Sequence, residues 1–138
     1  MEQTRSRGER ILALTGLIGG AAGAFAVAWF NPVTAGFFPQ CPLYQMTGLA
    51  CPGCGLTRGF HALFHGDVLT ALDYNALVLV YALFFVYLAA SLVCVVARGR
   101  GLSFKIFAPK VVYAFLFAAT AFTVLRNLPF YPFSVLYP

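Results

Sequence analysis

Three of the four cysteines and both histidines fall within one stretch, CPLYQMTGLACPGCGLTRGFHALFHGD. Cys51 and Cys54 form a C-P-G-C-G turn, which has the shape of a zinc or iron knuckle, because the glycines let backbone amides face the sulfurs. With Cys41 and His61, this pair supplies a Cys3His ligand set for zinc, and His65 is the alternative histidine. The pattern predicts a metal site, with zinc as the candidate cofactor.

The same cysteines allow other thiol chemistry. Cys51 and Cys54 precede an expected helix whose dipole lowers thiol pKa values, as in disulfide redox pairs. No soluble redox fold or quinone-site motif accompanies them. Cys41 could instead form a structural disulfide with either cysteine, closing a loop of about ten residues. Reduced cysteines in a compact turn shaped by glycine and proline are the remaining interpretation, and the spacing leaves all of these open.

The residues after the turn have helical periodicity. Cys54, Arg58, His61 and His65 follow one another at steps of four, three and four, so a helix would place them on one face. This pattern predicts an amphipathic helix with a polar stripe that includes one cysteine.

Residues at the end of this helix predict a second short one. Gly66 is a candidate C-cap, and Asp67 is a good N-cap for the segment VLTALDY. Asn75 then stands at the start of the next apolar run.

Arg58 lies beside apolar surface and requires a partner. Asp67 or Asp73 would supply an ion pair that fixes the segment to the rest of the protein. The functional alternative is an anion or lipid-headgroup site, with Arg126 and Asn127 alongside.

Composition determines the surroundings of this stretch. The chain is 61% hydrophobic and 9% charged, whereas soluble domains have about 25% charged residues. Lipid must therefore be its solvent. The net charge of +5 does not indicate a nucleic-acid partner, because no basic stripe is interleaved with aromatic residues.

Three apolar stretches predict membrane spans, at about residues 11–29, 76–97 and 106–125. A secretory signal competes for the first, but that run is longer than a signal core of about 7–15 residues and lacks a clear cleavage site. We therefore expect an all-α polytopic membrane bundle, a single domain over residues 1–138. A re-entrant or interfacial helical segment, part of the signature segment 41–75, follows the first span.

The basic residues predict an orientation. Seven of the nine lie before the first span, between the second and third, or near the start of the third, and these are Arg5, Arg7, Arg10, Arg98, Arg100, Lys105 and Lys110. Only Arg58 lies between spans one and two, and only Arg126 follows span three. The positive-inside rule then places the N-terminus in the cytoplasm. We expect a bacterial cytoplasmic membrane protein with its signature segment and C-terminus outside.

Small residues on the first span predict close helix packing. Gly16 with Gly20, and Gly19 with Gly23, form two small-xxx-small pairs. They would pack against the other spans, or bind a second copy or another membrane protein.

The signature segment resembles a known family on several short matches. These are Cys41-Pro42, Thr47-Gly48, CPGCGLTR from Cys51 to Arg58, Gly66-Asp67, Ala71 and Asn75. They are similar to a widespread family of small bacterial membrane proteins, a domain of unknown function with a C-P-G-C-G-x-T-R signature. Arg126-Asn127-x-Pro129 resembles its closing motif. The sequence departs from the family at Ala76, where proline is common, and the family does not demand the two histidines. The resemblance implies membrane location and supplies no activity.

Together these patterns favour a non-enzymatic membrane module with a compact outer site that binds a partner, a lipid or an ion, and no catalytic residue is assigned. The alternative is a metal or redox thiol site centred on Cys51 and Cys54. The residues expected to form the site are Cys41, Cys51, Pro52, Gly53, Cys54, Gly55, Thr57, Arg58, Asp67, Asn75, Arg126 and Asn127.

Overall fold

The fold is all-helical, as the sequence predicts. The computed structural model describes residues 7–103 and 108–130. These residues form six helices and no strand: α1 (Arg7–Trp29), α2 (Pro42–Thr47), α3 (Leu56–Phe64), α4 (Val68–Tyr74), α5 (Val78–Arg98) and α6 (Pro109–Arg126). Arg5, Lys105, the first residues of the predicted third span and the tail from residue 131 lie outside the described residues.

Three of the helices are long and apolar enough to cross a membrane, namely α1, α5 and α6. In their most apolar windows only 6%, 17% and 17% of the residues are buried. Their apolar side chains therefore face outward, as they do in lipid. The helix α1 begins at Arg7, a turn before the predicted start, because arginine and glutamate are good helix formers. Pro109 occupies the first turn of α6, where a missing N–H costs nothing.

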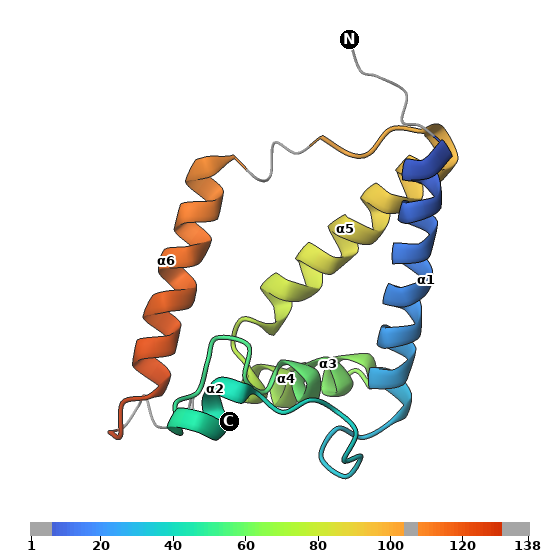
Figure 1. The fold of residues 1–138 in the computed structure, drawn as a ribbon. Coiled ribbons are helices and arrows are strands. Elements are labelled where there is room, and N and C mark those ends of the chain that lie inside the picture. Colours follow the sequence, from blue (N-terminus) through green and yellow to red (C-terminus); the bar gives the residue numbers. More distant parts are fainter. Residues whose placement is uncertain (1–6, 104–107, 131–138) are drawn as a thin grey trace.

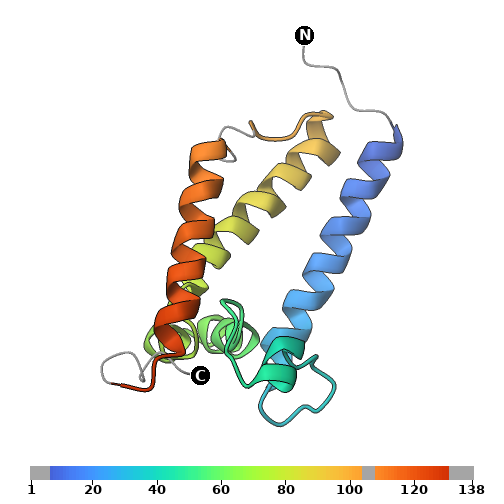
Figure 2. The ribbon, with the colours of Figure 1, turned by 60° about the vertical axis from the view of Figure 1, so that its left-hand side comes forward.

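The long helices differ in how closely they pack. The helix α1 packs along α5, which crosses the molecule at a tilt (Figure 1). In the described residues, the backbone of α6 approaches no other helix closely, and Figure 2 shows it standing beside the other two. Tyr81 of α5 and Phe115 of α6 meet edge to face, with ring centroids 5.8 Å apart.

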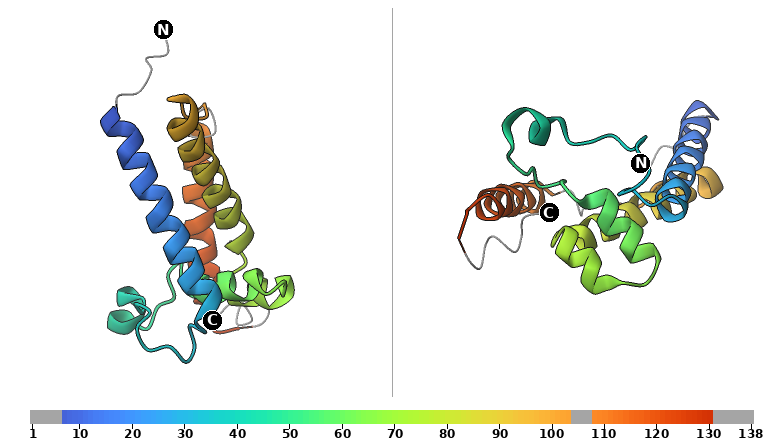
Figure 3. Two further views of the ribbon diagram at one scale, coloured as in Figure 1. Left: turned by 90° about the vertical axis from the view of Figure 1, so that its right-hand side faces the viewer. Right: turned by 90° about the horizontal axis from the view of Figure 1, so that it is seen from below.

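The short helices gather at one end of the bundle. There α3 and α4 lie across the ends of the long helices, packed on each other, with α2 apart from them (Figure 3). Ala62, Ala71 and Val78 form their small core. A β-carbon at Gly59 would lie 3.1 Å from the carbonyl oxygen of Ala71 and 3.2 Å from Val78 Cγ2. Glycine therefore permits the close approach of α3 to α4 and α5.

The helices α3 and α4 match the predicted helical segment, whereas α2 was not predicted. Gly66 follows α3 with a left-handed φ of 80°, and the Asp67 side chain accepts a hydrogen bond from the backbone N–H of Thr70 at 3.0 Å. The signals for α2 were present, because Pro42 begins it and Gly48 ends it with a φ of 71°.

Basic residues separate between the two ends of the bundle. The start of α1, the end of α5 and the start of α6 share one end (Figure 1). The described basic residues at this end are Arg7, Arg10, Arg98, Arg100 and Lys110. Arg58 and Arg126 lie at the other end, with α2, α3 and α4. The tertiary structure therefore keeps the charge asymmetry that the linear sequence predicts.

The glycines of α1 meet two environments. A β-carbon at Gly16 would lie 3.6 Å from Leu92 Cδ1 of α5, whereas none of Gly19, Gly20 and Gly23 would meet an atom within 4 Å. Gly20 and Gly23 line an apolar cavity of about 570 Å³ between α1, α3 and α5. Close packing within the chain therefore involves Gly16, and binding of another helix at the remaining glycines stays a prediction.

Candidate functional site

The cysteine turn from Ala50 to Gly55 leads directly into α3. The N–H of Cys54 donates to the carbonyl oxygen of Cys51 at 3.1 Å, and the N–H of Leu56 donates to that of Gly53 at 3.0 Å. Gly55 has a φ of 80°, which glycine adopts without strain. Because α3 begins at Leu56, Cys54 belongs to the turn. The expected helical stripe therefore does not include this cysteine.

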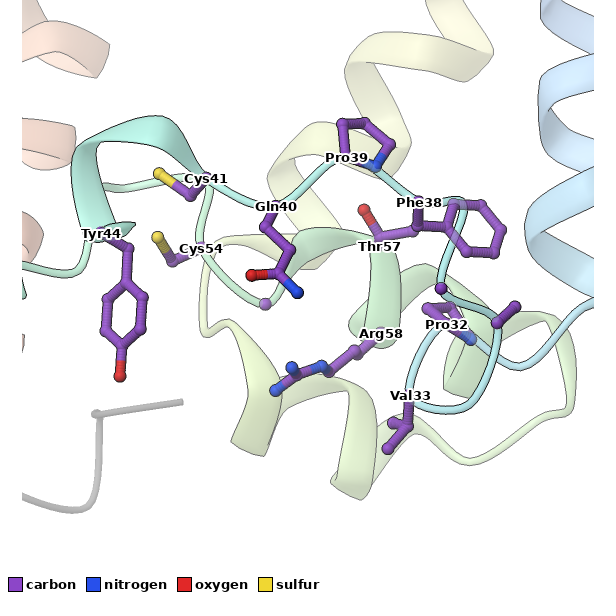
Figure 4. Close-up of a pocket in the computed structure, with 13 residues that line it drawn as sticks. Pro32, Val33, Phe38, Pro39, Gln40, Cys41, Tyr44, Cys54, Thr57 and Arg58 are labelled. Atoms are coloured by element: carbon purple, nitrogen blue, oxygen red, sulfur yellow. The ribbon is translucent and has the colours of Figure 1, made fainter. Parts of the chain in front are cut away.

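Three sulfurs meet at this turn. Cys51 Sγ lies 3.3 Å from Cys41 Sγ and 3.2 Å from Cys54 Sγ. The three sulfurs all lie within 4.8 Å of one another, close enough to hold one metal ion. Cys41 reaches the others because it immediately precedes α2, which lies beside the turn (Figure 4). All four cysteines are among the described residues and are free thiols, and Cys94 lies in α5 outside this cluster.

The sulfurs differ in acidity. The backbone N–H of Tyr44 favours the thiolate of Cys41 and, with hydrogen bonds from the neighbouring thiols, lowers its pKa to about 7. Burial disfavours the thiolate of Cys54, and together with the hydrogen bond to Cys51 it raises that pKa to about 12. In the metal-free protein, Cys41 is therefore about half thiolate at pH 7, whereas Cys54 remains protonated.

Asn75, between α4 and α5, holds the cysteine turn from one side. Its side chain is 1% exposed, and Nδ2 donates to the carbonyl oxygens of Pro52 at 2.9 Å and Cys54 at 3.1 Å. Its Oδ1 accepts from the N–H of Leu77 at 2.9 Å. Donor and acceptor are both used, so this position requires an amide.

The end of α6 holds the turn from the other side. Arg126 is fully buried, and its Nη1 donates to the carbonyl oxygens of Cys51 at 2.9 Å and Cys54 at 3.1 Å. The amide of Asn127 pairs with both backbone groups of Ala50, accepting from its N–H and donating to its oxygen, each at 2.9 Å. The backbone that carries the two cysteines is thus fixed by side chains distant in the sequence.

The histidines do not join the sulfurs. His61 Nδ1 lies 2.7 Å from the carbonyl oxygen of Val27. Because a carbonyl only accepts, Nδ1 carries the proton and connects α3 to the end of α1. His65 Nδ1 lies 2.8 Å from the carbonyl oxygen of His61. The expected Cys3His set is therefore corrected to three cysteines.

A cavity of about 280 Å³, lined by both polar and apolar groups, adjoins the thiol cluster (Figure 4). Cys41 and Cys54 line it, together with Thr57 and Arg58 from the first turn of α3. The ion pair expected for Arg58 is not formed with any described residue. Arg126 and Asn127, expected beside Arg58, hold the cysteine turn instead and do not line this cavity.

Several residues of this region were not foreseen. Ala50 is fully buried and pairs with Asn127. Tyr44 influences Cys41 through its backbone, and Gln40 lines the cavity. Nothing in their side-chain chemistry marks the first two, because they act through backbone groups. For Gln40, the only signal in the sequence is its position directly before Cys41, and that signal is weak.

In the described residues, the fold and site define a small all-helical protein with three candidate membrane spans and a thiol cluster at one end. Residues 41–89 match the model of a family described as a protein of unknown function, DUF2752. The family resemblance is thus confirmed for the segment from the thiol cluster into α5. The match does not extend to Arg126 and Asn127 and does not by itself show the C-P-G-C-G-x-T-R signature. No curated protein and no solved structure matches the chain.

Proposed function

We propose that the protein binds a thiophilic metal ion, with zinc as the leading candidate, through Cys41, Cys51 and Cys54. The observation that carries this proposal is the convergence of three sulfurs within 4.8 Å of one another. Zinc–sulfur bonds of about 2.3 Å in a tetrahedron separate the sulfurs by about 3.8 Å. Only small shifts of the side chains would bring them to that spacing.

The rigidity of the turn supports binding. Asn75, Arg126 and Asn127 donate or accept six hydrogen bonds with backbone groups of residues 50–54. A turn that is already ordered loses little conformational entropy when it takes up an ion. Three thiolates around a dication carry a net charge of −1, and the positive charge of Arg126 lies behind the turn.

The proposal includes a location for the cluster, at the outer face of a bacterial cytoplasmic membrane. Its support is the separation of charge along the bundle, with five described basic residues at the opposite end and two at the cluster end. Basic residues are retained on the cytoplasmic side. Zinc bound there would also protect the thiols from oxidation in that compartment.

A metal-free module that binds a partner or a lipid is the second candidate. The specific observation in its favour is that all six of these hydrogen bonds come from protein side chains. Because the turn is held together without an ion, the cysteines would serve as small packing groups in this case. The two candidates predict different metal contents and different effects of cysteine substitution.

Metal analysis of the purified protein, with thiol counting on the same sample, separates these candidates. We expect about one zinc per chain in the wild type and in the Cys94→Ser control. Each of Cys41→Ser, Cys51→Ser and Cys54→Ser should lose the metal while the chain still runs as a folded species on size exclusion. No metal with four free thiols would contradict both metal binding and disulfide chemistry. A disulfide without metal would contradict the proposal and favour redox chemistry.

A further inference from the structure

The cavity next to the cluster has features that the metal proposal does not use. Its wall is formed by most of residues 32–41 together with Tyr44, the end of the cysteine turn and the first turn of α3. Two of the three cysteines line it, so the cavity meets the cluster itself. At about 280 Å³ it lies just below the usual range for small-molecule sites, about 300–1,000 Å³. This volume suits a small metabolite and is too small for a phospholipid.

Arg58 gives the cavity its charge. Among the described residues that line the cavity, Arg58 is the only arginine, lysine, aspartate or glutamate. Within the described residues, neither Arg58 nor the Thr57 hydroxyl forms a hydrogen bond or ion pair. In Figure 4 the Gln40 side chain extends from its loop on the side where the Arg58 guanidinium lies. The described acids nearest in sequence, Asp67 and Asp73, do not line it. The cavity therefore offers a cation and a hydroxyl to a ligand.

From this arrangement we propose that the cavity binds a small anionic ligand of the metal ion. One end of the ligand supplies a donor atom to the ion at Cys41, Cys51 and Cys54. The other end is a carboxylate or similar oxyanion that pairs with Arg58. Three protein ligands leave a tetrahedral ion one position for such a molecule, and a guanidinium binds a carboxylate through two parallel hydrogen bonds. This inference rests on the proposed metal site.

Cobalt-substituted protein tests the inference, because Co²⁺ replaces Zn²⁺ and its visible spectrum reports thiolate ligands. The probes are mercaptoacetate and 2-mercaptoethanol, which share a thiol donor but differ in the carboxylate. We expect mercaptoacetate to bind the wild-type protein at least about tenfold more tightly. Arg58→Gln should remove this preference while leaving the affinities for cobalt and for 2-mercaptoethanol unchanged.

Two further variants support the interpretation. Arg58→Lys keeps the charge but loses the two-pronged geometry, so it should retain part of the preference. Arg98→Gln removes an arginine at the opposite end of the bundle and should leave the preference intact. A partial preference in Arg58→Lys would show that the positive charge at the cavity contributes to binding. An intact preference in Arg98→Gln would show that the net charge of the protein is not the cause.

The outcomes that overturn the two proposals are distinct. If the wild-type protein shows no cobalt–thiolate bands, the metal proposal fails before any ligand is added. If the bands appear but both thiols bind equally well, or Arg58→Gln preserves the preference, the cavity proposal fails and the metal site stands. The preference is measured in bilayers of phosphatidylcholine and of phosphatidylglycerol. Its loss only in the anionic lipid would assign Arg58 to the headgroup of an anionic lipid and overturn the small-ligand proposal.

Discussion

The Nη1 atom of Arg126 lies 2.9 Å from the carbonyl oxygen of Cys51, a residue 75 positions earlier in the chain. This hydrogen bond joins the last helix to the cysteine turn. The Arg126 guanidinium also stacks over Phe122, with Cζ 4.9 Å from the ring centroid. The backbone of α6 approaches no other described helix closely, so this connection makes α6 part of the site.

Replacing Arg126 with methionine should destabilise the cysteine turn. The carbonyl oxygens of Cys51 and Cys54 would lose a charged donor in a buried place, at a cost of about 2–4 kcal/mol. We expect the melting temperature in detergent to fall by roughly 10 °C, and metal retention to fall with it. Thermal unfolding followed by size exclusion measures the first effect, and metal analysis measures the second.

Arg98→Met is the matched control for this substitution, because Arg98 is an exposed arginine at the other end of the bundle. It should change the melting temperature by no more than about 2 °C. Arg126→Lys should fall between the two, since an ammonium reaches fewer acceptors in this geometry. Equal melting temperatures for Arg126→Met and Arg98→Met would refute a role of Arg126 in holding the turn.

Asn75→Asp should be more damaging than its small change in shape suggests. The amide Nδ2 of Asn75 donates to two carbonyl oxygens in a place that is 1% exposed. A carboxylate would face both oxygens without a proton, at a cost of about 3 kcal/mol or more. Asn31→Asp is the control, because the exposed Asn31 only accepts through its side chain. Comparable expression and melting temperatures for the two variants would contradict this account.

Gly59→Ala tests the close packing of α3. The added methyl group would lie 3.1 Å from the carbonyl oxygen of Ala71 and 3.2 Å from Val78 Cγ2. Neither neighbour is a flexible side-chain end, so we expect a loss of about 1–3 kcal/mol. Gly19→Ala has nothing within 4 Å and should be neutral or slightly stabilising, because alanine favours helix. Thermal unfolding of both variants measures these effects. A Gly59→Ala protein as stable as the wild type would argue against this packing.

The reactivity of the thiols should depend on pH in a defined order. Thiolate is the reactive form, so in the metal-free protein alkylation of Cys41 should rise with pH through a midpoint near its pKa of about 7. Cys54, with a pKa of about 12, should react slowly throughout the neutral range. Mass spectrometry after timed iodoacetamide treatment at pH 5–9 gives the rate at each cysteine. Faster labelling of Cys54 than of Cys41 would contradict this order.

Topology reporters test the proposed orientation. A phosphatase that is active only outside the cytoplasm should be active when fused after Pro138 and inactive when inserted after Gly101. A fluorescent protein that folds only in the cytoplasm should give the opposite pattern. The expectation follows from the excess of basic residues at the end of the bundle that includes Arg100 and Lys110. A cytoplasmic reading after Pro138 would reverse the placement of the thiol cluster.

The sequence by itself determined the solvent of the protein and most of its local structure. Long uncharged runs predict spanning helices because unpaired backbone groups are costly in lipid. The pair Gly66 and Asp67 predicts where α3 ends and α4 begins, since both signals act through neighbouring residues. The C-P-G-C-G sequence likewise predicts a turn, and Gly55 adopts the left-handed φ that such a turn needs.

Only the tertiary structure decided which residues meet. The four ligands of a zinc site suggested His61 as the fourth, but the end of α1 offers it a carbonyl acceptor at Val27. The predicted topology put Arg126 on the same side of the membrane as Arg58, and one interpretation placed the two side by side. In the structure, Arg126 instead donates to carbonyl oxygens of the cysteine turn. Every residue carries the same backbone carbonyl, so the sequence does not indicate which carbonyl oxygens will accept these hydrogen bonds. The sequence therefore identifies the cysteines of the site, whereas only the tertiary structure identifies the side chains that hold them in place.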